Sequence, residues 1–269
     1  MAQSKLFLAI DIGNTHTVLG IFRATRLIAD WRLTSALQRT ADEISVPVLQ
    51  FLSMAGVAPK SIAGVGISSV VPDLTDVYRT MVRTHFRVEP LIVGSDLDLG
   101  FRILYEDPKA VGADRLCDAV AGYEKYGGPL IIIDFGTATT YDVIAENGDY
   151  LGGVIAPGIE TSAADLHRRA AKLPKIGLQL PATIIGTDTV SSMQAGILWG
   201  AVDSMEGMIK RIQQVVVKKE GTRATVIATG GFSTFVSRNS NTIAHVEPTL
   251  VLEGIRLISE RTERGKKRR

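Results

Sequence analysis

The chain has 269 residues, of which 45% are hydrophobic, and its formal net charge is +2. This composition is typical of a soluble globular protein with one large or two modest domains, and no apolar run approaches the roughly 18 residues of a transmembrane helix. The small net charge does not support nucleic-acid binding, so we interpret the dense basic run at residues 264–269 as a solvated tail.

Cysteine and histidine usage limits the possible metal chemistry. The single cysteine, Cys117, excludes an intramolecular disulfide and a multi-cysteine zinc site, and the histidines show no metal-ligand spacing. Oxygen ligands are therefore expected for any bound metal. The apolar run that ends at Asp11 is too short for a signal peptide, so a cytoplasmic location without membrane attachment is expected.

The first third of the chain predicts three strands followed by alternating helices and strands. Turn-prone residues separate the first three apolar runs, which favours an antiparallel meander over residues 6–11, 17–23 and 27–34. Apolar spacing then predicts helices at residues 41–57 and 73–86, and buried strands at residues 61–70 and 88–95.

Residues 112–127 predict a helix that carries a candidate catalytic carboxylate. Asp114 occupies the expected N-cap position, and an apolar stripe runs along the helix to Gly127. Capping is one explanation for Asp114. Near a phosphate site, however, the carboxylate would accept the proton of an attacking hydroxyl, and Arg115 would hold a carboxylate or a phosphoryl group. Cys117 is interpreted as a small buried residue.

The second half of the chain repeats the plan of the first. An apolar strand again ends in Asp-x-Gly-Thr at Asp134, and a second strand, an Asn147-Gly148 turn and a third strand follow. A long helix is expected over 189–219, then a strand ending in VIATGG and a final helix. We therefore predict two copies of a βββαβα plan, in domains spanning residues 1–127 and 128–269.

The repeated Asp-x-Gly turns suggest phosphate binding. Backbone N–H groups and small hydroxyls suit phosphate oxygens, and glycine permits close approach of a ligand. Asp11 would repel a bare phosphate, so hydrated Mg²⁺ is expected between them. Ordinary hairpin turns explain one copy about as well, but two copies favour phosphate. Neither a P-loop nor a dinucleotide-binding glycine motif is present.

Five motifs in this order, AIDIGNT, GADR, IIDFGTATTYD, GGVIAPG and VIATGG, closely resemble the type III pantothenate kinase family. That family belongs to the superfamily of acetate and sugar kinases, heat-shock ATPases and actin. The resemblance runs from about Leu6 to Ile258 and implies an α/β fold of two duplicated actin-like (ribonuclease-H-like) domains with an ATP cleft between them. It also implies the ATP-dependent phosphorylation of the pantothenate 4′-hydroxyl, the first step of coenzyme A biosynthesis.

The resemblance also implies residue roles. The ATP-binding residues would be Asp11, Ile12, Gly13, Asn14, Thr15, His16, Thr17, Val18 and Thr137. The pantothenate-binding residues would be Tyr105, Gly112, Ala113, Asp114, Arg115 and Thr189. Asp114 would be the general base, Asp11 would lie near Mg²⁺, and Asp134 would bind a monovalent cation, K⁺ or NH₄⁺.

Thr189 would reach the pantothenate site of a neighbouring subunit, because members of the family are homodimers with shared sites. It also stands where a helix N-cap is expected, and both roles are compatible. Asp188 occupies a position where many members have asparagine. Two alternatives remain open: another sugar or acetate kinase of the superfamily, and a non-catalytic transcription accessory protein.

Overall fold

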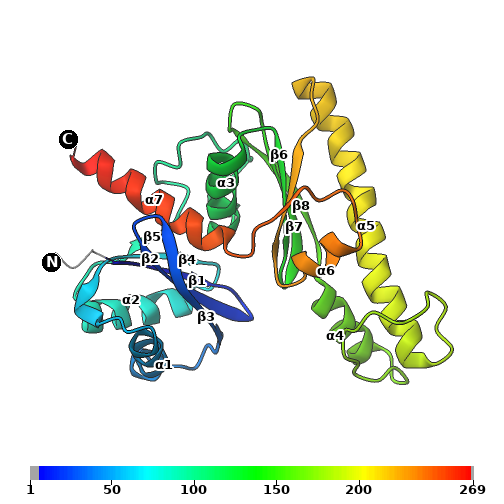
Figure 1. Ribbon diagram of the computed structural model, residues 1–269, viewed down its shortest axis with the longest axis horizontal. Coiled ribbons are helices and arrows are strands. Elements are labelled where there is room, and N and C mark those ends of the chain that lie inside the picture. The colour runs from blue at the N-terminus through cyan, green and yellow to red at the C-terminus, as the bar shows by residue number, and fades with distance from the viewer. Residues whose placement is uncertain (1–5, 268–269) are drawn as a thin grey trace. The chain divides into compact units, whose positions relative to one another are not determined.

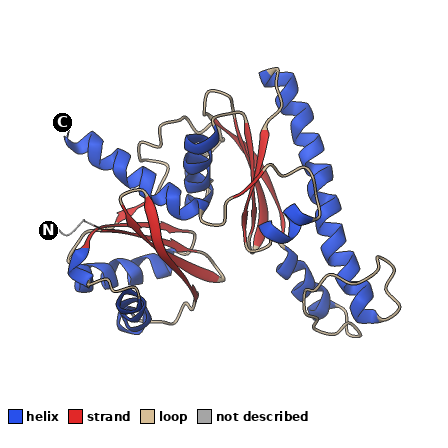
Figure 2. Cartoon of the chain, viewed as in Figure 1, coloured by secondary structure: helices blue, strands red, loops and turns tan. Residues whose placement is uncertain are grey.

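The computed structural model describes residues 6–267 (Figures 1 and 2). Side chains are described up to residue 265. They form two compact units, each built on one five-stranded sheet. Unit 1 contains the described residues of Met1–Phe101, Tyr105–Ala121 and Thr249–Arg269, and unit 2 contains Arg102–Leu104 and Gly122–Pro248.

The sheet of unit 1 has the strand order β3-β2-β1-β4-β5. Its strands are β1 (Leu6–Ile12), β2 (His16–Arg23), β3 (Arg26–Thr34), β4 (Ile62–Ser69) and β5 (Leu91–Ile92). The first three form the predicted antiparallel meander, and β4 and β5 add parallel to β1. Helices α1 (Ala41–Met54), α2 (Pro72–Phe86), α3 (Ala113–Tyr126) and α7 (Leu250–Lys267) complete the unit, with short 3-10 turns at Pro59–Ser61 and Pro108–Ala110.

The two faces of this sheet are covered by different helices. Alternate strand residues such as Ile10 and Ile67 join α1 and α2 in one buried core. Helix α7 packs on the other face, where a Cβ at Gly66 would lie 2.5 Å from Cγ2 of Ile255. Glycine at this point of β4 therefore lets α7 lie close against the sheet.

Unit 2 repeats this arrangement, with the strand order β10-β9-β6-β7-β8. Its strands are β6 (Leu130–Phe135), β7 (Ala138–Ile144), β8 (Tyr150–Pro157), β9 (Thr225–Gly230) and β10 (His245–Val246). Its helices are α4 (Ile159–Arg169), α5 (Thr189–Glu220) and α6 (Ser233–Arg238), together with the C-terminal end of α3. Since β6 to β10 pair as β1 to β5 do, the duplicated α/β plan is confirmed.

The packing units differ from a single division after residue 127. Helix α7 follows β10 in the chain but packs on β1 and β4, so residues 249–267 belong with the first sheet. Leu252 also supplies a contact to that sheet, because a Cβ at Gly20 would lie 2.7 Å from its Cδ1. The division at 127/128 therefore stays a prediction about the duplicated sequence plan. In the packed structure, the last helix of the chain belongs to unit 1.

Some local predictions need correction. Helix α3 begins at Ala113, which places Asp114 in its first turn rather than at the N-cap. The predicted solvated tail continues α7 as far as Lys267, and its last two residues lie outside the described residues. Among residues 6–267, no helix combines the length and the apolar character needed to cross a membrane.

Candidate functional site

The turn after β1 is held by hydrogen bonds that leave its side chains exposed. The Gly13 N–H donates to the His16 carbonyl oxygen (3.0 Å), and the Ser35 hydroxyl donates to the Gly13 carbonyl oxygen (2.6 Å). Asn14, Thr15 and His16 are exposed. The turn therefore presents polar side chains to solvent on a fixed backbone.

The neighbouring residues of this predicted ATP loop divide by burial. Ile12 and Thr17 point into the structure, and Val18 is half-buried on β2. The Thr17 hydroxyl lies 2.9 Å from that of Ser35, so the same serine links both sides of the turn. The inward residues shape the turn, whereas the exposed ones are accessible to solvent.

Asp11 is partly buried at the end of β1 and is hydrogen-bonded by a residue that sequence analysis missed. The hydroxyl of Ser68, a fully buried side chain, donates to Asp11 Oδ1 at 2.9 Å. The two residues are register partners on the parallel strands β1 and β4. The carboxyl ends of adjacent parallel strands meet at one edge of a sheet, so the polar end of the 61–70 run was the available signal.

Asp114 lies over a glycine in the first turn of α3. Its Oδ1 accepts the Arg115 backbone N–H (2.8 Å), and a Cβ at Gly112 would lie 2.4 Å from the same oxygen. Burial raises the pKa of Asp114, and the Arg115 N–H and guanidinium oppose the rise. A carboxylate with a raised pKa is a stronger base, which suits proton abstraction from a hydroxyl.

Cys117 lies within electrostatic range of three carboxylates of unit 1, those of Asp11, Asp114 and Asp118. Burial raises the pKa of its thiol well above the usual range, and the charges of Asp11, Asp118 and Asp114 raise it further. The thiol is fully buried, as the sequence suggested. The fold thus brings Asp11 from β1 and Asp114 from α3 to one neighbourhood, although about 100 residues separate them.

The second turn, after β6, has its own set of hydrogen bonds. The Gly136 N–H donates to the Ala138 carbonyl oxygen (3.0 Å), and Thr137 is exposed. The Gly158 N–H and the Thr161 hydroxyl both donate to the Thr137 carbonyl oxygen, at 3.2 and 2.6 Å. The start of α4 therefore supports this turn, a contact that the sequence did not indicate.

Asp134 lies against Gly230, the first glycine of the VIATGG motif. Gly230 has a φ of +83°, and a Cβ there would lie 2.2 Å from Asp134 Oδ1. A Cβ at Gly136 would lie 3.3 Å from Asp134 Oδ2. Glycine is required at 230 both by the backbone angle and by the approach of this carboxylate.

Thr189 is the first residue of α5 and is not its N-cap. Asp188 is the cap: its Oδ1 accepts the N–H groups of Val190 (2.9 Å) and Ser191 (3.0 Å). The Ser191 hydroxyl lowers the pKa of Asp188. Thr189 is exposed and lines a cavity of about 690 Å³ between α4 and the start of α5, a cavity whose lining contains none of the other predicted site residues.

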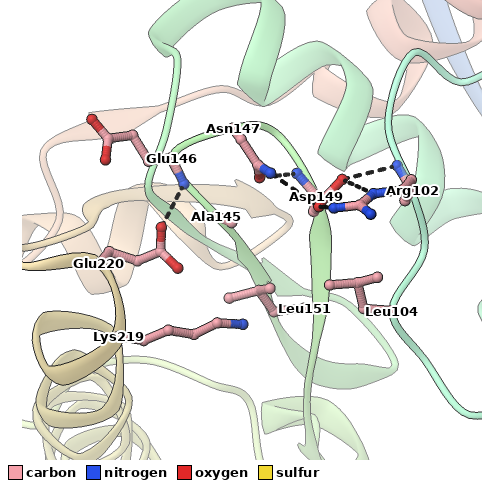
Figure 3. Close-up of a pocket in the computed structure, with 9 residues that line it drawn as sticks. All are labelled: Arg102, Leu104, Ala145, Glu146, Asn147, Asp149, Leu151, Lys219 and Glu220. Atoms are coloured by element: carbon pink, nitrogen blue, oxygen red, sulfur yellow. Dashed lines mark hydrogen bonds and ion pairs between the residues drawn. The ribbon is translucent and has the colours of Figure 1, made fainter.

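The remaining predicted residues lie in unit 1. Tyr105 is 37% exposed in the segment before α3, whereas Ala113 and Arg115 are buried at the start of that helix. A second cavity of about 470 Å³ lies at the β7–β8 turn of unit 2, at the opposite end of β7 from the turn after β6, and its lining contains no predicted residue (Figure 3).

The residues present fit a loosely held hard cation rather than a protein-built metal cage. Across the described part of the chain, no group of three or more His, Cys, Asp or Glu side chains is arranged to hold a metal ion. Mg²⁺ commonly keeps several waters and takes one or two carboxylates together with phosphate oxygens. The partly buried Asp11 carboxylate satisfies that requirement.

Sequence comparison finds close relatives over almost the whole chain. A family model described as type III pantothenate kinase matches residues 7–211. A type III pantothenate kinase of Moorella thermoacetica is 46% identical over 95% of this chain and 99% of its own. One of Bacillus cytotoxicus is 44% identical over 95% of this chain and 96% of its own.

Solved structures share the fold at low sequence identity. MreB 5 of Spiroplasma citri bound to AMPPNP is 11% identical over 98% of this chain and 99% of its own, with a TM-score of 0.56. A Campylobacter jejuni protein described as a Baf family transcriptional activator is 18% identical over 96% of this chain and 99% of its own, with a TM-score of 0.55. These similarities support the duplicated actin-like architecture and say nothing of the reaction.

Proposed function

The chain belongs to the type III pantothenate kinase family, and from this premise we propose how its residues act. The protein is a kinase that phosphorylates pantothenate with ATP in coenzyme A biosynthesis. The observation that supports our assignment of roles is that Asp11 and Asp114 both lie in unit 1, within electrostatic range of the buried Cys117.

In our proposal, Asp114 is the general base. Its carboxylate accepts the proton of the 4′-hydroxyl as that oxygen forms a bond to the γ-phosphorus of ATP and the bond to the β–γ bridging oxygen breaks, leaving ADP. The raised pKa of Asp114 and its fixed position over Gly112 support this role. Pantothenate is bound and oriented for this step by Tyr105, Gly112, Ala113 and Arg115.

The two turns bind the phosphates of ATP in this proposal. Residues 11–18 and Thr137 contribute exposed hydroxyl, amide and imidazole groups on backbones that hydrogen bonds keep in place. Preorganised donors of this kind stabilise the charge of a transferring phosphoryl group. Mg²⁺ bound near Asp11 supplies charge neutralisation of the phosphate oxygens.

Three further roles belong to the proposal. Asp134 binds a monovalent cation, K⁺ or NH₄⁺, which is supported by a partly buried carboxylate at the end of β6, held closely against Gly230 beside the second turn. The protein forms a homodimer in which Thr189 contributes to the partner's pantothenate site, and the exposure of Thr189 at the start of α5 is compatible with this contact. We also expect a cytoplasmic location.

The test is an assay of ATP-dependent phosphorylation of pantothenate, in which coupled detection of ADP release gives the rate with and without added K⁺. Asp114→Asn is expected to lower kcat by about 10² to 10⁴-fold, the usual contribution of a general base. A folded Asp114→Asn variant with near wild-type turnover would refute the assignment of the base. Sedimentation that shows only monomer at micromolar concentration would contradict the shared site.

A further inference from the structure

Three residues of the loop between β5 and α3 are bound to the second unit. Arg102–Leu104 belong to unit 2, whereas Phe101 and Tyr105 on either side belong to unit 1. The Leu104 N–H donates to the Tyr150 carbonyl oxygen (2.8 Å), and the Tyr150 N–H donates to the Arg102 carbonyl oxygen (2.9 Å). Ile103 thus forms a parallel bridge with Tyr150 at the start of β8.

A side-chain ion pair reinforces this bridge (Figure 3). The Arg102 backbone N–H and Nε both donate to Asp149 Oδ1 at 3.2 Å, and a terminal guanidinium nitrogen donates to Oδ2. The side chain of Asp149 is only 8% exposed, and Asn147 Nδ2 donates to its Oδ2 at 3.0 Å. The carboxylate is therefore held by several donors, whereas the Arg102 side chain is 74% exposed, so the restraint comes from the two-point geometry of the pair and not from burial of the guanidinium.

The start of β8, to which Arg102–Leu104 are attached, is itself firmly held. The hydroxyl of Tyr150, a fully buried side chain, donates to Asp142 Oδ1 on β7 at 2.5 Å. The Arg102 hydrogen bond lowers the pKa of Asp149 to about 2. The pair is consequently ionised throughout the neutral pH range, so it acts as a constant restraint and not as a pH switch.

The exposed segment that carries Tyr105 begins directly after this attachment. Residues 104–110 are exposed, and the chain is next fixed at the buried Val111. Between these points the Asp107 side chain accepts the Lys109 N–H (3.0 Å) and caps the short 3-10 turn. The position of Tyr105 therefore depends on the attachment just before it.

We propose that the Arg102–Asp149 pair is a clamp that positions the Tyr105 segment for pantothenate binding. This inference rests on the proposed role of Tyr105 as a residue that lines the substrate. Arg102 and Asp149 are positioning residues that act through this segment. Without the clamp, the segment must be ordered when pantothenate binds, which weakens substrate binding more than turnover.

Another ion pair in the chain provides a matched control. Arg83 and Glu89 form a two-point pair, with Nε–Oε2 at 2.6 Å and a terminal nitrogen to Oε1 at 2.8 Å. Both side chains are more than half exposed. Glu89→Gln removes a carboxylate from a comparable pair that is not attached to the Tyr105 segment.

The experiment measures kinetics and amide hydrogen exchange in the full-length protein. Arg102→Gln and Asp149→Asn are expected to raise KM for pantothenate by about three- to tenfold, with kcat and KM for ATP changed less than about twofold. Exchange should accelerate over residues 102–112 and stay slow in β6. Arg102→Lys should raise KM for pantothenate less than Arg102→Gln does, and Glu89→Gln should behave as wild type.

Unchanged KM for pantothenate and unchanged exchange over 102–112 in both clamp variants would overturn the proposal. An equal effect of Glu89→Gln would do so as well, because it would show a general loss of charge pairing. Tyr105→Ala separates the two levels: if its KM for pantothenate equals that of wild type, the proposed role of Tyr105 fails, whatever exchange shows for the clamp.

Discussion

Helices α3 and α7 cross so closely that only glycine fits at one position. Gly254 lies in α7, and a Cβ there would stand 2.1 Å from the carbonyl oxygen of Cys117 and 2.5 Å from its carbonyl carbon. Both contacts are with backbone, which no rotamer change relieves. Gly254→Ala must therefore separate the two helices or distort one of them.

The size of the effect follows from this geometry. The added methyl group reaches ordinary contact distance only if the backbones separate by about 1 Å. Overpacking of this kind typically costs about 1–3 kcal/mol, and the better helix propensity of alanine returns up to about 1 kcal/mol. Taking the net cost as about 1–2 kcal/mol, we expect a fall in the apparent Tm of roughly 2–8 °C.

The same displacement should impair catalysis. Asp114 lies one helical turn before Cys117 on α3, so a shift of the backbone at Cys117 moves the proposed base. A misplacement of about 1 Å can lower the rate by about 10²-fold. We therefore expect kcat for pantothenate phosphorylation to fall by about one to two orders of magnitude, a larger effect than the stability change alone would cause.

Thermal unfolding and coupled ADP release test both parts of this prediction, with Gly207→Ala as the matched control. Gly207 is also an interior residue of a long helix, but a Cβ there would meet nothing within 4 Å. That variant should match or exceed the wild-type Tm and keep its turnover. If Gly254→Ala behaves like Gly207→Ala, the close crossing of α3 and α7 is not the constraint that we describe.

Three further predictions concern single side chains. Since burial raises the pKa of Asp114 above its usual 3.8, the acid limb of the kcat/KM profile should lie at higher pH than for an ordinary aspartate. A raised carboxyl pKa lowers the free energy of unfolding as pH rises from the unfolded-state pKa to the folded-state pKa. Asp114→Asn should therefore lose activity without a lower Tm at pH 7.5. Ser68→Ala should raise the Mg²⁺ concentration needed for half-maximal rate severalfold, because Asp11 loses the hydrogen bond that holds it. The control is Ser45→Ala, which removes a buried serine hydroxyl bonded to the Asp42 carbonyl oxygen of α1, and an equal effect from it would contradict this prediction. Asp188→Ala removes the α5 cap and should cost about 0.5–2 kcal/mol in thermal unfolding, whereas Asp188→Asn should cost little.

Local patterns were sufficient to predict most of the elements. The strand pairs on either side of Asp11 and Asp134, the long α5 and the repeat itself are all evident from apolar spacing and the repeated Asp-x-Gly motif. Helix α4 was not predicted, although the Gly158 and Thr161 at its start support the second turn. This helix is short and polar on average, and Ile159 is its only buried residue, so its one-sided apolar pattern rests on very few residues.

Contacts between distant segments were beyond the reach of the sequence. Ser68 meets Asp11 because β1 and β4 pair in parallel, and the Arg102–Asp149 pair joins a loop to a strand start 47 residues later. The polar end of the 61–70 run was a signal for Ser68, but the pairing itself depends on strand register, and the Arg102 contact depends on where a loop attaches.

The sequence by itself determined the family, the duplicated plan and the candidate residues, because hydrophobic periodicity and short glycine-containing motifs are local properties of the chain. Only the tertiary structure decided that α7 covers the sheet of the first unit, that Asp11 and Asp114 both lie within electrostatic range of Cys117, and that Gly230 leaves room for the Asp134 carboxylate. These features arise from packing between segments far apart in the chain, and their energies depend on distances that no local pattern encodes.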